Sequence, residues 1–153
     1  TLTHPLLTAL SDEEVIRQVE EDRLKLSDLA GYEVVGMAYP GGKPNYDERC
    51  AKLIAKNTGA LYARTTVSSH DFDKQRDLYV FCPTVYHHGE WDKLFELGEQ
   101  FIRMEATKPQ IFYVWGHSYE FDIHDTWDKF EEFLKLISGK ENVFYGTNKE
   151  VLL

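Results

Sequence analysis

The stretch QIFYVWGHSYEFD, residues 110–122, decides the fold that the sequence predicts. Apart from Gln110, residues 110–115 are apolar or aromatic, which is too dense for a half-exposed strand and typical of one buried on both faces. Polar and ionisable side chains begin at once after Gly116, starting with His117. A buried strand that ends in a polar rim favours a parallel α/β sheet, in which ligands bind at the carboxyl ends of the strands.

The rest of the chain alternates short apolar segments with helical patterns. The sequence predicts strands at residues 32–40, 60–64, 77–84 and 110–115, one or two more within 142–153, and loops at 40–45 and 65–77. Helices are expected at residues 11–31, 46–59, 90–104 and 125–140. The first is marked at both ends, because Ser11 and Glu14 have capping-box spacing and Gly31 can stop the helix. This order predicts one α/β domain whose parallel sheet is open or closed into a barrel.

Composition and charge exclude several classes of function. A chain of 153 residues with 42% hydrophobic residues can bury a real core. The net charge of −9 argues against binding nucleic acid or an anionic membrane surface, because both need a basic face. No apolar run approaches the roughly 20 residues of a membrane-spanning helix. Cys50 and Cys82 lie among apolar neighbours and are expected to be free thiols, which favours a reducing, cytoplasmic location.

Candidate site residues are those that directly follow the predicted strands. They are Tyr39 to Gly42, Arg64, His87 with His88, and His117 to Glu120. Each also has a structural interpretation: a lone histidine is most often satisfied by hydrogen bonds, and Pro-Gly-Gly is most often a tight turn. The chain contains no GxGxxG, P-loop, CxxC pair, HExxH or GxSxG motif. The sequence therefore disfavours nucleotide-binding, zinc-ribbon, zincin and α/β-hydrolase functions.

Several spaced motifs together resemble the polysaccharide deacetylase family, the NodB-homology domain of carbohydrate esterase family four. Thr1-Leu2-Thr3-His4-Pro5 is similar to its second metal-binding motif without the first histidine. Ala38-Tyr39-Pro40-Gly41-Gly42 is similar to its proline loop, and Val114-Trp115-Gly116-His117 to its last motif. The strings LYART, CPTVYHH and WGHSYEFD also resemble bacterial members.

The resemblance implies a distorted (β/α) barrel, incomplete at its N-terminal side, of which residues 1–153 form the C-terminal portion. It implies a carbohydrate deacetylase that removes acetyl groups from N- or O-acetylated sugars with a divalent metal, zinc by preference. His4 would be a metal ligand, His117 the general acid and Gly41 an oxyanion N–H donor. The acetyl group and the sugar would contact Val114, Trp115, Tyr39, His87 and His88.

The chain also departs from the family pattern. The Thr-Phe-Asp-Asp-Gly motif that carries the catalytic base and a metal ligand is absent, and Ala38 stands where the proline loop has arginine. We hypothesise that Arg64 replaces that arginine. One histidine cannot complete a ligand set, so we expect weak or no metal binding by this chain alone. A missing first strand would leave a sheet edge that invites dimerisation.

Two other functions compete with the deacetylase. The first is a catalytically silent domain of the same fold that binds sugars through Tyr39, Trp115 and Tyr119. The second is a glycosidase that uses Glu120 with Asp122 or Asp125 as its carboxylate pair. Zinc content, acetate release and sugar binding separate the deacetylase from the silent domain.

Overall fold

The computed structural model describes residues 1–42 and 45–153, so Lys43 and Pro44 of the predicted 40–45 loop lie outside the described residues. The described chain divides into two compact units. Unit 1 comprises residues 1–66, 75–82 and 147–153, and unit 2 comprises residues 67–74 and 83–146. The assignment of the whole chain to one domain stays a prediction.

Unit 1 begins with the long helix that the sequence predicts. Helix α1 spans Asp12–Ala30, the Ser11 hydroxyl accepts the Glu14 N–H, and Gly31 ends the helix in the left-handed conformation at φ 72°. Helix α2, Glu48–Asn57, starts at Asp47, whose carboxylate accepts the Cys50 N–H. Both helices are confirmed, and in both cases a side chain at the N-terminus supplies the acceptor that the first turn lacks.

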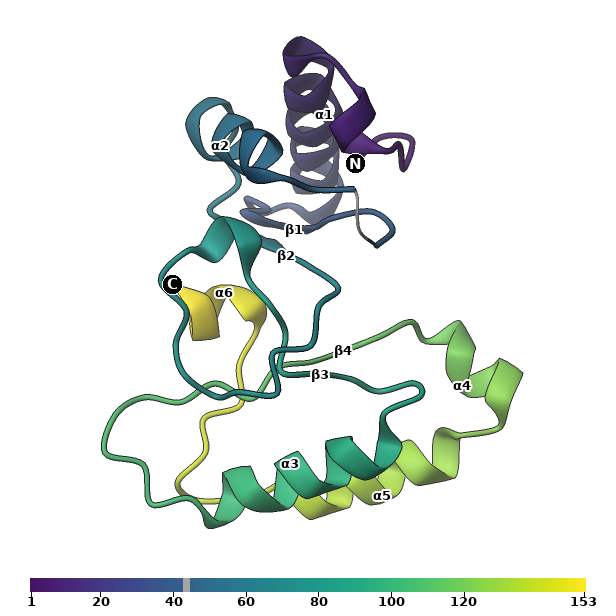
Figure 1. Cartoon of the computed structure of the whole chain (residues 1–153), viewed down its shortest axis with the longest axis vertical. Coiled ribbons are helices and arrows are strands. Elements are labelled where there is room, and N and C mark those ends of the chain that lie inside the picture. Colours follow the sequence, from purple (N-terminus) through teal and green to yellow (C-terminus); the bar gives the residue numbers. More distant parts are fainter. Residues whose placement is uncertain (43–44) are drawn as a thin grey trace. The chain divides into compact units, whose positions relative to one another are not determined.

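The remaining elements of unit 1 are short. Strands β1, Gly36–Ala38, and β2, Tyr62–Arg64, pair in parallel. The 3-10 helices η1 and η2 span Leu7–Ala9 and Leu78–Val80, and helix α6 spans Asn148–Leu152. Figure 1 shows α1 and α2 on one side of β1 and β2. The core between them contains Leu7, Val15, Val19, Tyr39, Cys50, Ile54, Ala60 and Ala63.

Unit 2 pairs two long helices with a second small sheet. Helices α3, Trp91–Arg103, and α5, Trp127–Ile137, confirm two predicted helices and lie side by side in Figure 1. Strands β3, Val85–Tyr86, and β4, Val114–Trp115, pair in parallel, and the short helix α4, Tyr119–His124, follows β4. The core consists of Phe72, Val85, Leu94, Leu97 and Phe133.

The predicted (β/α) barrel is wrong. Within the described ranges, the sheets are two separate two-stranded parallel pairs, and most of the regular structure is helical. A barrel needs every strand to be hydrogen-bonded on both sides around a closed ring. Here the paired segments are only three residues long in β1 and β2 and two in β3 and β4.

Two segments predicted as strands contain short helices in the structure, although Phe81 of the first still forms a parallel bridge with Arg64. In residues 77–84, the Asp77 carboxylate accepts the Tyr79 N–H and starts η2. In residues 142–153, Thr147 and Glu150 form a complete capping box that starts α6. In both segments, side-chain acceptors close to the helix start determine the secondary structure, although the composition is rich in residues that favour strands.

Two further sequence expectations can be compared with the structure. Cys50 and Cys82 are both free thiols, Cys50 buried and Cys82 half-buried. No helix in the described part of the chain is long and apolar enough to cross a membrane.

Candidate functional site

The candidate site lies at the carboxyl ends of β3 and β4 in unit 2. The register pairs Val85 with Val114 and Tyr86 with Trp115. Because the strands are parallel, the residues that follow them meet at one edge of the sheet. His87 and His117 therefore come together beside the same Glu120 carboxylate, although about thirty residues separate them in the sequence. We name Tyr86, His87, Trp115, His117 and Glu120 the β3–β4 edge.

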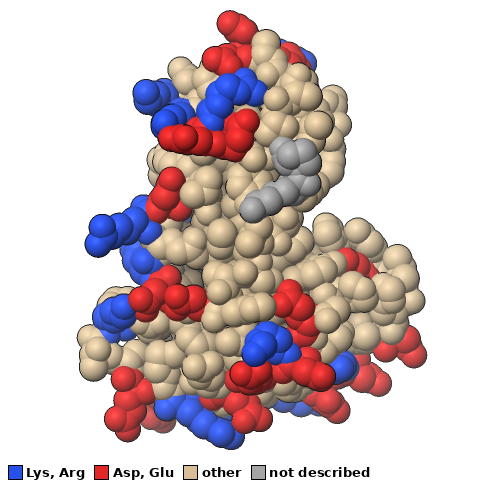
Figure 2. All heavy atoms as spheres, viewed as in Figure 1, with Lys and Arg blue, Asp and Glu red and all other residues tan. Residues whose placement is uncertain are grey.

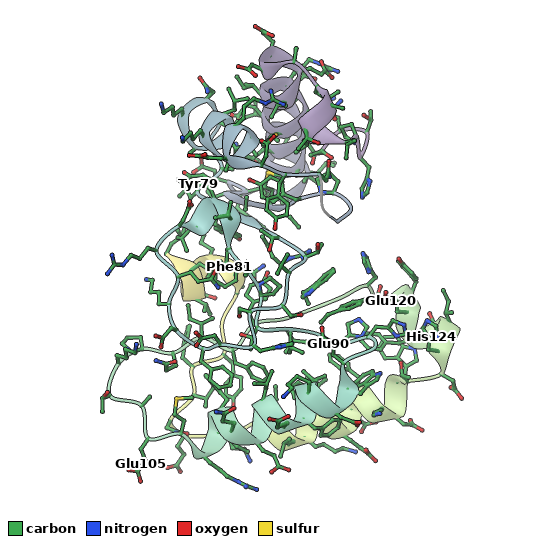
Figure 3. All side chains as sticks on the ribbon, in the orientation of Figure 1. Tyr79, Phe81, Glu90, Glu105, Glu120 and His124 are labelled. Carbon is green, nitrogen blue, oxygen red and sulfur yellow. The ribbon has the colours of Figure 1, made fainter. Side chains whose placement is uncertain are left out.

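Glu120 is the centre of this edge. Its Oε2 accepts the backbone N–H of His117 at 2.9 Å and lies 3.3 Å from His117 Nδ1 and 3.2 Å from His87 Nε2. The Tyr86 hydroxyl donates to its Oε1. Figure 3 labels Glu120 on α4. Helix α4 makes this geometry, because His117 lies two residues before the helix and Glu120, in its first turn, reaches back to the His117 N–H.

The hydrogen bonds keep Glu120 ionised. Its burial works to raise the pKa of this carboxyl, but the donations from the Tyr86 hydroxyl and the His117 N–H outweigh burial, and the pKa lies below its ordinary value. Burial, and then the hydrogen bond to Glu120, raise the pKa of Tyr86, which therefore stays protonated. A glycosidase acid needs a raised pKa, so Glu120 does not suit the acid role of the glycosidase hypothesis.

The two histidines that face Glu120 differ in their environment. The His117 side chain is 49% exposed, and its Nδ1 faces the Glu120 carboxylate. His87 is 3% exposed, and its ring stacks on Phe121 with 4.3 Å between centroids. Neither ring nitrogen of His87 has an aligned hydrogen-bond partner within the described chain. Burial lowers the pKa of His87 despite the nearby Glu120, so this ring is neutral near pH 7.

The other predicted residues of unit 2 surround this edge. The Trp115 ring stacks on Tyr86 with centroids 4.5 Å apart, and the Val114 side chain packs against the unit 2 core. His88 stacks on His124, the last residue of α4, at 4.0 Å. His87 is buried and contacts other protein groups. Trp115 and His88 are half-buried, so part of each remains exposed to solvent.

The remaining predicted residues belong to unit 1. Tyr39 is buried at 3% exposure, and its hydroxyl donates to the Tyr79 carbonyl at 2.8 Å. Gly41 has a φ of 69°, and Arg64 donates to the Thr65 carbonyl at 2.8 Å. His4 is exposed with a φ of 55°. Tyr39 and Gly41 follow β1, Arg64 is the last residue of β2, and His4 precedes the first helix. Their assigned roles stay predictions.

No metal site accompanies these residues. Among residues 1–42 and 45–153, no group of three or more His, Cys, Asp or Glu side chains is arranged to hold a metal ion. The zinc ion that the resemblance implies therefore finds no ligand set in the described residues, and its involvement stays a prediction.

Sequence reasoning missed the role of Glu120 beside His117 and a second histidine–carboxylate pair. The spacing His117-x-x-Glu120 is the signal that could have shown the first, had residues 119–124 been predicted as a helix. In the second pair, Glu90 Oε2 lies 2.6 Å from His70 Nε2 and its Oε1 accepts the Ser68 hydroxyl at 2.9 Å. His70 has a φ of 52°, a conformation that local sequence patterns do not reveal.

Comparisons with known proteins identify no relative: no family model matches the chain, and searches of curated proteins and of solved structures found no match. The resemblance to polysaccharide deacetylases therefore rests on the motifs alone.

Proposed function

We propose that the chain is a hydrolase that removes acetyl groups from N- or O-acetylated sugars, with His117 as the general acid. The observation that carries the proposal is the contact of a half-exposed histidine with an ionised, buried carboxylate at the end of β4. The motif resemblance assigns the acid role to the same histidine.

The surroundings of His117 suit proton transfer. A carboxylate beside Nδ1 orients the imidazole ring and stabilises its protonated form, while Nε2 stays available to the substrate. Glu120 is itself held by Tyr86 and by the His117 N–H, so the orienting group is fixed before substrate binds. A fixed orienting group reduces the reorganisation that proton transfer needs.

The rings beside His117 suit a sugar. Trp115 and Tyr119 flank it in the sequence, with centroids 5.8 Å and 5.1 Å from the imidazole. Aromatic rings with a polar tip pack against the apolar faces of ligands and still donate hydrogen bonds. The net charge of −9 disfavours polyanionic substrates and leaves neutral or cationic sugars.

The proposed reaction balances with water as the second reactant. The water oxygen bonds to the acetyl carbon, the bond from that carbon to the sugar nitrogen or oxygen breaks, and the His117 imidazolium gives its proton to the leaving atom. Both protons of the water leave the new acetate oxygen: one returns to the His117 imidazole and the other goes to solvent. The products are acetate and the free amine or hydroxyl.

Acetate release from an acetylated chito-oligosaccharide, with and without added Zn²⁺, tests the proposal. General acid catalysis contributes about 10²- to 10⁴-fold, so His117→Ala should lose that much of the rate. Glu120→Gln keeps an oxygen to accept the His117 N–H but loses the charge, and we expect a smaller loss. Glu96→Gln, an exposed change on α3, is the matched control and should leave the rate unchanged. Full activity in His117→Ala would refute the role of this residue.

A silent carbohydrate-binding domain is the second candidate. The observation that favours it is the lack of a metal-ligand group within the described residues, together with exposed aromatic rings on α4 and α5. Sugar binding without acetate release at any Zn²⁺ concentration would favour this function over the hydrolase.

A further inference from the structure

The histidines of unit 2 differ in the groups that they face. Three of them lie beside a carboxylate, namely His70, His87 and His117. The other two, His88 and His124, face each other, and their rings stack with 4.0 Å between centroids and 19° between planes. Within the described chain neither ring has a carboxylate partner that could offset a positive charge. This pair therefore responds to protons differently from the other three histidines.

The stack is one of the contacts that hold α4 against the β3 segment. Helix α4 has only six residues, which is too short to be stable without such contacts. It is held through Glu120, which accepts the Tyr86 hydroxyl, and Phe121, which stacks on His87 at 4.3 Å. His124 holds its last turn, and Figure 3 labels both Glu120 and His124 on this helix. Each contact involves a side chain that can change its charge.

Protonation acts on the His88–His124 stack in two steps. Histidine is the side chain whose charge ordinarily changes between about pH 5 and pH 8. One proton on the pair leaves a neutral ring against a charged ring. A second proton places like charges against each other with ring centroids 4.0 Å apart. The docked pair thus binds fewer protons than a separated pair, so a lower pH favours separation.

The neighbours of His88 on β3 and β4 do not relieve this repulsion. The His87 ring lies 6.5 Å from His88. Burial is the main cause of the lowered pKa of His87, and a charge on His88 adds to it. The Tyr86 ring lies 5.9 Å from His88 but stays protonated and uncharged. The Glu120 carboxylate is shared between His87 and His117.

The charged groups on the other neighbouring elements are engaged elsewhere. Asp122 of α4 accepts an indole N–H of α5, and Glu90 before α3 faces His70. Lys129 of α5 lies over an aromatic ring of α3. Asp125, which follows α4, is exposed and has no ion pair among the described residues. Figure 2 shows mainly uncharged surface over α4 with acidic side chains at its borders.

We propose that α4 is a pH-operated cover of the β3–β4 edge, docked while the His88–His124 stack carries at most one proton and released when both rings are protonated. Release moves Glu120 away from His117 and opens Phe121 and the buried His87 to water. In the proposed hydrolase the general acid would then lose the carboxylate that orients it, so acid would switch the reaction off. This last consequence alone rests on the proposed function.

Hydrogen exchange of the α4 amides tests the cover without any need for turnover. Protection factors, corrected for the intrinsic exchange rate, are compared at about pH 8 and about pH 5 in the whole chain. We expect protection of α4 to fall by about tenfold in acid, since two like charges in contact bias an equilibrium by about that much, while α3 and α5 keep theirs.

Three variants show whether the stacked pair is responsible. His124→Phe keeps a ring against His88 but cannot take up a proton, so protection of α4 should stay nearly constant between the two pH values. His88→Gln removes the other partner and should also abolish the acid response. His70→Asn is the matched control, because asparagine tolerates the left-handed conformation at φ 52° and the histidine it removes faces a carboxylate. This control should respond to acid as the wild type does.

The outcomes separate the cover from the hydrolase proposal. An equal fall of protection in the wild type, His124→Phe and His88→Gln overturns the cover, as does an unchanged wild type. A fall that includes α3 and α5 also overturns it, because unit 2 then unfolds as a whole. A fall confined to α4 and dependent on His124, without acetate release at any pH, supports the cover and refutes the hydrolase.

Discussion

Replacing Gly116 by alanine tests the packing that holds the β3–β4 edge together. A Cβ atom at this position would lie 1.7 Å from His87 Cδ2 and 1.9 Å from His87 Nε2. Neither distance can be accommodated unless the imidazole or the backbone moves. The ring is buried and stacked on Phe121, so a movement of His87 displaces a second core side chain.

The expected cost follows from two opposing effects. Overpacking a well-packed core costs about 1–3 kcal/mol. Alanine also has less conformational freedom than glycine in the unfolded chain, which stabilises the folded state by about 0.4–1 kcal/mol. We therefore expect Gly116→Ala to lower the free energy of unfolding of unit 2 by about 1–2 kcal/mol. The displaced imidazole would also lose its 3.2 Å contact with Glu120, which should reduce any activity that depends on His117.

Urea unfolding followed by tryptophan fluorescence measures this cost. All three tryptophans, Trp91, Trp115 and Trp127, belong to unit 2, so the signal reports on that unit. A double-mutant cycle provides the control, because His87→Ala removes the atoms that the new Cβ would meet. In that background Gly116→Ala should cost nothing or stabilise. An equal cost in both backgrounds, or none in the wild type, would refute the packing argument.

Three further predictions concern Glu120, His87 and Thr147. Tyr86→Phe removes a hydrogen bond to the charged Glu120 and should destabilise unit 2 by about 1.5–3 kcal/mol in the same urea assay. The pKa of Glu120 should also rise in this variant, which an NMR titration measures. The pKa values of His87 and Glu120 are both lowered by folding, so the unfolded chain binds more protons in acid, and the unfolding free energy should fall first below pH 6.5 and again below pH 4.5. His87→Phe should abolish only the first decline, and an unchanged urea-unfolding profile would contradict the neutral His87. Thr147→Ala should speed hydrogen exchange of the α6 amides, whereas Thr147→Ser, which keeps the hydroxyl of the capping box, should leave it unchanged.

Helices were predictable from the sequence because their signals are local. Helices α1, α2, α3 and α5 all appear where apolar residues recur at helical spacing. Ser11 and Gly31 bound α1 as expected, since each acts on groups within one turn of itself. Helix α6 is not predicted even though Thr147-x-x-Glu150 repeats the spacing of Ser11-x-x-Glu14, because the aromatic and β-branched residues before it are typical of a strand.

Strands were overestimated because an apolar run does not specify a pairing partner. In residues 77–84 the side chain of Gln75 bonds both the N–H and the carbonyl of Cys82, at 2.8 Å and 2.6 Å. These are the backbone groups that a continuous sheet ladder would use. At Cys82 a glutamine seven residues away thus takes the place of a strand partner, although the preceding Phe81 still forms a parallel bridge with Arg64. No periodicity in the apolar residues could have revealed this arrangement.

The sequence predicts where the candidate site lies, but it does not predict how His87 and His117 differ within it. Parallel pairing of β3 with β4 does bring His87 and His117 to one edge, as the rule about strand ends implies. Both histidines lie near the same carboxylate oxygen, so residue type and partner cannot distinguish them. Burial does: His87 is 3% exposed and its lowered pKa keeps it neutral, whereas the His117 side chain is 49% exposed beside ionised Glu120. A Cβ atom at position 116 would meet the His87 ring, so Gly116, the glycine that precedes His117, is what allows the buried His87 to lie so close to the end of β4.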